Sequence, residues 1–94
     1  MNELPTLELL EATHDFPGTY VFKAIGKNRD GFAARIVASV RLELDLEIDP
    51  PFEVRQTAQG RHVSVTVTPQ IKSAPQVLAI YVRLSAIDGL VMLF

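Results

Sequence analysis

The segment at residues 61–69 reads RHVSVTVTP, and from His62 onward it alternates without a break between polar and apolar side chains. Its apolar positions fall on one face of an extended chain: Val63, Val65 and Val67. This alternation of β-branched and polar residues predicts a strand with one buried face. A second strand is expected at residues 53–58, because Gln59-Gly60 between the two suits a tight hairpin turn.

The chain after this hairpin indicates a helix followed by a last strand. Ser73 and Gln76 have the spacing of a capping box, and Pro75 lies in the first turn, where it costs no helical hydrogen bond. One apolar stripe then recurs at helical spacing: Val77, Ile80, Tyr81 and Leu84. Asp88-Gly89 is expected to end the helix, and the apolar run at 90–94 is expected to pair inside the sheet.

The chain before the hairpin predicts a strand at 19–25 and a helix at 30–44. Tyr20 and Phe22 mark the core face of the strand, which Gly26 closes. Asp30 is the expected N-cap of the helix, because its carboxylate can accept hydrogen bonds from the first free backbone amides.

Residues 42–49 alternate with period two, so they fit a half-buried strand as well as the end of this helix. We favour a helix to Leu44 followed by a connection that Pro50 and Pro51 end, with an additional edge strand as the alternative.

The predicted order of strand, helix, strand, strand, helix, strand indicates an α+β fold. It is the ferredoxin-like βαββαβ sandwich, with a four-stranded antiparallel sheet in the order 4-1-3-2 and two helices on one face. Residues 16–94 are assigned to this domain and residues 1–15 to an N-terminal arm. A short helix starting near Thr6 is possible in the arm, which we expect to dock weakly on the body.

Composition excludes several classes of function. The 94 residues suffice for one small domain, and a net charge of −2 argues against binding to nucleic acid or an anionic membrane. The chain has no cysteine, and His14 and His62 stand far apart, so no catalytic constellation, metal site or cofactor is expected. No signal peptide or membrane span is recognisable, and a cytoplasmic location is expected.

The predicted topology gathers basic residues at one edge of the sheet: Lys27, Arg29, Arg55 and Arg61. At the start of a helix, backbone amides and the helix dipole add to such charge, which favours a small anion. Gly26, Gly31 and Gly60 would let a ligand approach the backbone. The alternative is that these cations are ordinary solvated surface charge.

The second candidate surface is the face of the sheet that the helices leave open. Four apolar side chains are expected to point there: Val21, Ile25, Val91 and Leu93. Exposed apolar surface usually marks an interface, so this face or the adjoining edge strand is expected to be covered by another copy, another protein or the N-terminal arm. RNA recognition is not favoured, because the open face of the predicted central strands lacks an aromatic platform.

Several short motifs resemble the YbeD-like family of small bacterial proteins of unknown function. They are the segments at 16–17, 20–26 and 60–67, followed by Gln76, Ile80-Tyr81 and Leu84. His62 stands where that family typically has a tyrosine. The family is described as similar in fold to ACT regulatory domains, with a suggested regulatory role connected to lipoate metabolism.

The segment at 25–36 also looks like the first strand-to-helix turn of ACT domains. Asn28 and Gly31 fit that turn, whereas Asp30 stands where proline is common. ACT domains pair through their sheets and bind amino acids or other small ligands near this turn. The resemblance therefore implies a ligand site that also includes Arg29, at the same edge as the basic residues.

Two hypotheses follow. The first is a small regulatory or adaptor domain, dimeric through its sheet, that binds a small anionic or zwitterionic ligand at the turn between the first strand and the first long helix. Its site would comprise Lys27, Asn28, Arg29, Asp30, Gly31 and Arg61. The second is a protein-protein interaction module that acts through the open sheet face without a ligand.

Overall fold

The computed structural model describes residues 4–94, and the alternating segment forms the strand β4 (His62–Val67). Its partner in the hairpin is β3 (Phe52–Gln56), which runs antiparallel to it with Val54 opposite Val65. All three valines on the dry face of β4 are 1% exposed or less. The predicted hairpin and its buried face are confirmed, although β3 ends at Gln56 and β4 begins at His62, so the connection is longer than the expected turn at Gln59-Gly60.

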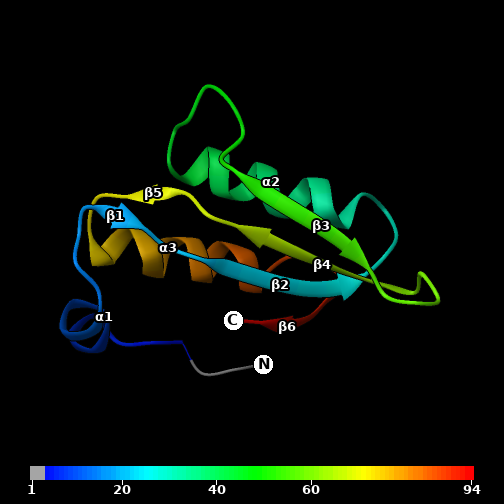
Figure 1. Ribbon diagram of the computed structural model, residues 1–94, viewed down its shortest axis with the longest axis horizontal. Coiled ribbons are helices and arrows are strands. Elements are labelled where there is room, and N and C mark those ends of the chain that lie inside the picture. Colours follow the sequence, from blue (N-terminus) through cyan, green and yellow to red (C-terminus); the bar gives the residue numbers. More distant parts are fainter. Residues whose placement is uncertain (1–3) are drawn as a thin grey trace.

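Two further strands complete the main sheet. β2 (Phe22–Lys27) lies antiparallel to β4, and β6 (Leu90–Leu93) lies antiparallel to β2. The order is β3-β4-β2-β6, which gives each strand the neighbours that the sequence predicts (Figure 1). An α+β architecture with antiparallel sheets is therefore established.

The helices α2 (Phe32–Glu43) and α3 (Ala74–Ser85) contact each other and lie side by side behind this sheet in Figure 1. The apolar stripe of α3 is buried as predicted, with Ile80 and Leu84 fully inaccessible. These side chains meet Phe22 and Phe32 in one core between the helices and the sheet. None of the helices in residues 4–94 has the length and hydrophobicity that crossing a bilayer requires.

The first expected strand is interrupted, which corrects its predicted bounds. β1 (Gly18–Thr19) pairs with β5 (Gln70–Ile71) in a small separate sheet, and β2 begins only at Phe22. The two-residue breaks lie opposite one another, and Tyr20 N–H donates to Pro69 O across them at 3.1 Å. Because Pro69 has no N–H, the ladder between the two segments is interrupted there, and pairing continues in the same register between β1 and β5.

The start of α2 differs from the prediction that Asp30 caps it. The N-cap is Gly31, with φ of 67°, and no side chain caps the helix. Asp30 also has a positive φ of 54°, so both residues lie in the left-handed region. The left-handed backbone of Asp30 and Gly31 leads directly into the helix, so the N-cap lies one residue after Asp30.

The capping box at α3 forms only in part. Ser73 is the N-cap, but its side chain makes no capping hydrogen bond. Gln76 Oε1 instead accepts from the N–H of Lys72 at 2.7 Å, one residue before the N-cap. The glutamine therefore reaches back as a capping box requires, whereas the serine hydroxyl does not.

Residues 44–51 form an irregular connection, as favoured over an additional strand. Asp45 has φ of 54°, which is incompatible with an extended chain, and Arg41 Nη1 lies 2.6 Å from Asp49 Oδ1. The period-two pattern in this segment therefore reflects no sheet pairing.

The helix α1 (Leu7–Thr13) begins where the sequence predicts, and Thr6 Oγ1 accepts from Leu9 N–H at 3.1 Å. Its Leu10 is 1% exposed and belongs to the core, and α1 contacts α3. The remainder of the predicted arm at residues 1–3 lies outside the described residues. The division of the chain at residue 16 stays a prediction.

Candidate functional site

The turn between β2 and α2 is fastened to the β3-β4 hairpin by one asparagine. Asn28 N–H donates to Arg61 O at 3.0 Å, and Asn28 Nδ2 donates to Gly60 O at 2.9 Å. At the base of the turn, Lys27 lies opposite His62 in the sheet. The predicted site residues at 27–31 and 61 are therefore neighbours at one end of the molecule.

A third loop, which connects α3 to β6, joins this end through Arg35 of α2. Arg35 Nε donates to Asp30 O at 3.0 Å, and its Nη1 donates to Asp88 O at 3.1 Å. Lys27 N–H donates to Gly89 O at 2.9 Å. No sequence motif indicates that Arg35 connects these loops, because both of its acceptors are backbone carbonyls.

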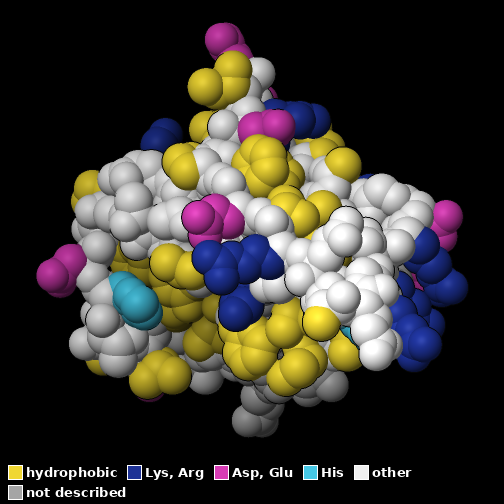
Figure 2. Space-filling view, turned by 45° about the vertical axis from the view of Figure 1, so that its right-hand side comes forward, with side chains coloured by type: hydrophobic (Ala, Val, Ile, Leu, Met, Phe, Trp, Pro, Cys, Tyr) yellow, Lys and Arg dark blue, Asp and Glu magenta, His cyan; other side chains and the backbone are white. Residues whose placement is uncertain are grey.

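The charged side chains at this end are open to solvent. Arg29 Nε lies 3.8 Å from Asp30 Oδ2, but the two side chains are 59% and 76% exposed, so this pair contributes little. Lys27 and Arg61 are exposed, and within residues 4–94 neither takes part in an ion pair. Figure 2 shows a group of Lys and Arg side chains at the right of the view.

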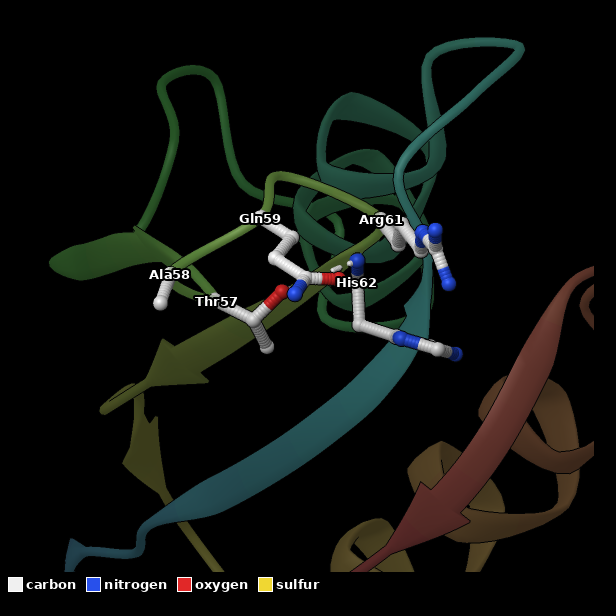
Figure 3. Close-up of a pocket in the computed structure, with 5 residues that line it drawn as sticks. All are labelled: Thr57, Ala58, Gln59, Arg61 and His62. Carbon is white, nitrogen blue, oxygen red and sulfur yellow. Dashed lines mark hydrogen bonds between the residues drawn. The ribbon is translucent and has the colours of Figure 1, made fainter.

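The hairpin loop forms a surface pocket of about 380 Å³ beside this turn. Figure 3 shows its lining residues: Thr57, Ala58, Gln59, Arg61 and His62. Thr57 and Gln59 point toward the backbone of His62, whose N–H donates to Thr57 Oγ1 at 3.3 Å, and Arg61 extends toward the turn into α2. The pocket is open to solvent, and four of its five lining residues carry polar side chains.

The glycines expected to admit a ligand have different roles. A Cβ at Gly31 would meet no atom within 4 Å, so the backbone there is accessible. Because no side chain caps α2, none occupies the N–H groups of its first turn. Gly26, in contrast, is buried under the ring of Phe32, so its small size serves packing and the expectation of ligand access there was wrong.

Arg55, the fourth basic residue predicted at this edge, lies within β3 opposite Ser64. This register places it on the open face of the sheet, because Val54 and Val65 take the helix side.

The open face differs from the prediction at one residue. Val21 and Val91 are 56% and 47% exposed, and Ile25 is partly exposed. Leu93 is only 3% exposed and lies in the core, so its expected exposure was wrong. Met92, which is 41% exposed, takes its place opposite Ile25.

A β-bulge explains this exchange. Ile25 pairs with Met92, but the next residue, Gly26, pairs with Leu90, so Val91 is an extra residue in β6. One inserted residue reverses the faces of the residues beyond it in a strand of period two. Figure 2 shows hydrophobic side chains gathered below the centre of the view.

Aromatic side chains form a cluster at the opposite end of β2. The hydroxyls of Tyr20 and Tyr81 lie 3.1 Å apart, and the ring of His14 lies 4.9 Å from that of Tyr20. Burial and then the Tyr20 hydroxyl raise the pKa of Tyr81 well above its usual range. Within residues 4–94, no group of three His, Asp or Glu side chains is arranged to hold a metal ion.

A family model described as "Protein of unknown function (DUF493)" matches residues 11–94. The chain belongs to the DUF493 family. This confirms the predicted YbeD-like relationship.

Curated relatives of this DUF493 chain are named only as UPF0250 proteins. One from Shewanella loihica is 33% identical over 75 residues, covering 80% of this chain and 83% of the relative. Another from Ralstonia nicotianae is 30% identical over 90 residues, covering 90% and 88%. The solution structure of protein HP0495 from H. pylori is similar with a TM-score of 0.65 at 12% identity, covering 100% of this chain and 98% of that one. At this identity the likeness supports the fold alone.

Proposed function

We propose that this DUF493 protein is a small cytoplasmic regulatory or adaptor domain with a ferredoxin-like core. It binds a small anionic or zwitterionic ligand where the β2–α2 turn meets the hairpin. The observation that carries the proposal is the pair of hydrogen bonds from Asn28 to Gly60 and Arg61, because they hold the basic turn beside the hairpin pocket.

The chemistry of this end suits a carboxylate or phosphate of modest size. Lys27, Arg29 and Arg61 supply solvent-accessible positive charge. The start of α2 adds the backbone N–H groups of Ala33 and Ala34, because Phe32 N–H already donates to Arg29 O. The proposed likeness of this turn to ACT domains points to the same ligand class. The open pocket and the absence of a buried charged side chain within residues 4–94 favour reversible binding over catalysis.

Isothermal titration calorimetry against amino acids, lipoate and nucleotides tests this proposal. The double variant Arg29→Ala/Arg61→Ala is expected to weaken binding by about ten-fold or more, because charge-assisted hydrogen bonds to the anion are lost. The double variant Lys72→Ala/Arg83→Ala removes the same charge away from the turn and should bind like the wild type. Absence of binding by the wild type, or equal weakening in both variants, would contradict the proposal.

A second candidate function is protein-protein interaction through the open sheet face. Exposed Val21, Val91 and Met92 favour it, because apolar side chains exposed on an open sheet face often mark an interface. A partner retained by the wild type and lost with Met92→Lys would support this function, whereas equal retention by both would exclude the face.

A further inference from the structure

The outer edge of β3 is one of the two free edges of the main sheet. β3 ends the main sheet, and all five of its residues are exposed. Phe52 and Val54 are 48% and 43% exposed, although their register places them on the helix side of the sheet. The helices therefore do not cover this margin, and a fifth strand would bury it.

The hydrogen bonds of the hairpin determine which backbone groups face outward. Thr57 N–H donates to His62 O at 3.0 Å, and Thr68 N–H donates to Pro51 O at 2.9 Å. In an antiparallel ladder the residues that bond to a given neighbour alternate. Positions 51, 53, 55 and 57 thus face β4, and the N–H and C=O groups of Phe52, Val54 and Gln56 point away from the sheet.

The side chains of β3 are self-complementary about Val54. When two copies of the segment FEVRQ run antiparallel with Val54 opposite Val54, the outward backbone groups of Phe52 meet those of Gln56 in the second copy. Glu53 then lies directly opposite Arg55 of the second copy, and the two-fold axis repeats the pair. These pairs occupy non-hydrogen-bonded positions, where facing side chains come closest.

We propose that two copies of this protein associate through their β3 edges, in the register centred on Val54. The main sheets join into one continuous antiparallel sheet with two symmetry-related Glu53–Arg55 ion pairs. Within residues 4–94, neither Glu53 nor Arg55 has an ion-pair partner in the single chain. The contact is isologous and uses the same edge twice, so it closes at two copies.

The other edge of the sheet lacks these properties. The segment LVML at β6 carries no charged side chain that could select a register, and its bulge interrupts regular pairing. Pro50 and Pro51 immediately precede β3, and Pro50, at an outward position, has no N–H to offer a longer strand. The β3 edge is therefore matched in length and charge to its own copy. This association is independent of the proposed ligand site.

Sedimentation equilibrium from roughly 10 µM to roughly 1 mM tests the association, because an edge contact of this size is expected to bind in that range. Glu53→Arg and Arg55→Glu should each weaken the dimer by about ten-fold or more, because each places like charges opposite one another. Glu47→Arg makes the same charge change on the exposed connection, so it should leave the dimer intact.

Complementation distinguishes this register from any other contact. The double variant Glu53→Arg/Arg55→Glu should dimerise like the wild type, and an equimolar mixture of the two single variants should form a heterodimer, because opposite charges again face each other. An isotope-filtered nuclear Overhauser effect between Glu53 Hα and Arg55 Hα of the second copy should appear only at high concentration. A wild type that stays monomeric throughout, or a double variant as weak as the singles, would overturn the proposal.

Val54→Pro and Met92→Lys supply a second pair of variants. Proline at position 54 removes an outward N–H without breaking the ladder to β4, so it should abolish the dimer while the thermal unfolding transition stays cooperative. Met92→Lys alters the open face and should leave the β3 dimer intact. Loss of the dimer in Met92→Lys, with retention in Val54→Pro, would assign the contact to the open face instead.

Discussion

Replacing Gly26 with alanine tests how tightly α2 packs on the sheet. Gly26 is buried in β2, and the ring of Phe32 occupies the space that a Cβ would need. Phe32 is 1% exposed and packed among core residues, so the ring has no free volume to enter. Gly26 is not among the glycines with positive φ, so alanine introduces a steric conflict without backbone strain.

The expected cost is that of overpacking a core, about 1–3 kcal/mol. A chain of 94 residues has a total free energy of unfolding of about 5–14 kcal/mol, so the variant should still fold. Each 1 kcal/mol lowers Tm by roughly 4–8 °C in a domain of this size, which gives a decrease of roughly 4–24 °C. Thermal and urea unfolding followed by circular dichroism would measure both quantities.

A double-mutant cycle with Phe32→Leu identifies the cause. The smaller side chain releases the space above position 26, so Gly26→Ala should cost about 1 kcal/mol less in that background. The control is Gly60→Ala in the hairpin, which should cost the same in both backgrounds because it acts through a φ of 71° and not through Phe32. Equal costs of Gly26→Ala with and without Phe32→Leu would refute the packing argument.

Three further predictions concern other parts of the fold. Leu10→Ala should lower the free energy of unfolding by about 2–5 kcal/mol, as measured in urea, because α1 contributes a core side chain; a loss below about 0.5 kcal/mol would make α1 a loosely attached arm. Asn28→Ala should cost about 0.5–1.5 kcal/mol and should speed hydrogen exchange at the hairpin, and unchanged exchange would contradict the bond to Gly60. The raised pKa of Tyr81 means that the folded state holds this proton more tightly than the unfolded state. The contribution of Tyr81 to the free energy of unfolding is therefore fully present below pH about 10 and is lost at higher pH. Tyr81→Phe should flatten that fall in a series of denaturation curves, and an unchanged slope would assign it to other groups.

The regular elements were predictable because each has a period tied to burial. β4 alternates between core and open face, and α3 repeats its apolar stripe every three to four residues, so the side chains alone indicate strand and helix. The strand order followed from the right-handed crossover rule. The position of the turn beside the hairpin followed from that order, since it places both at one end of the sheet.

The local departures arise where a single residue alters the backbone path. The bulge at Val91 places Met92 on the open face and Leu93 in the core. Nothing in the run LVMLF distinguishes this register from the expected one. The left-handed conformation of Asp30 moves the start of α2, although its side chain suits an N-cap. Arg35 bonds to backbone carbonyls, which every sequence offers at every position, so only the folded chain shows its partners.

The hydrogen bonds that hold together the end with the β2–α2 turn span long stretches of the chain. The bond from Asn28 to Gly60 joins residues 32 positions apart, and the bond from Arg35 to Asp88 joins residues 53 positions apart. Contacts of such sequence separation form only after long loops have closed. A nascent chain therefore lacks the Arg35–Asp88 contact until residue 88 has been synthesised, and a protein shortened before that residue would lose the contact even where β2, α2 and the hairpin remain folded.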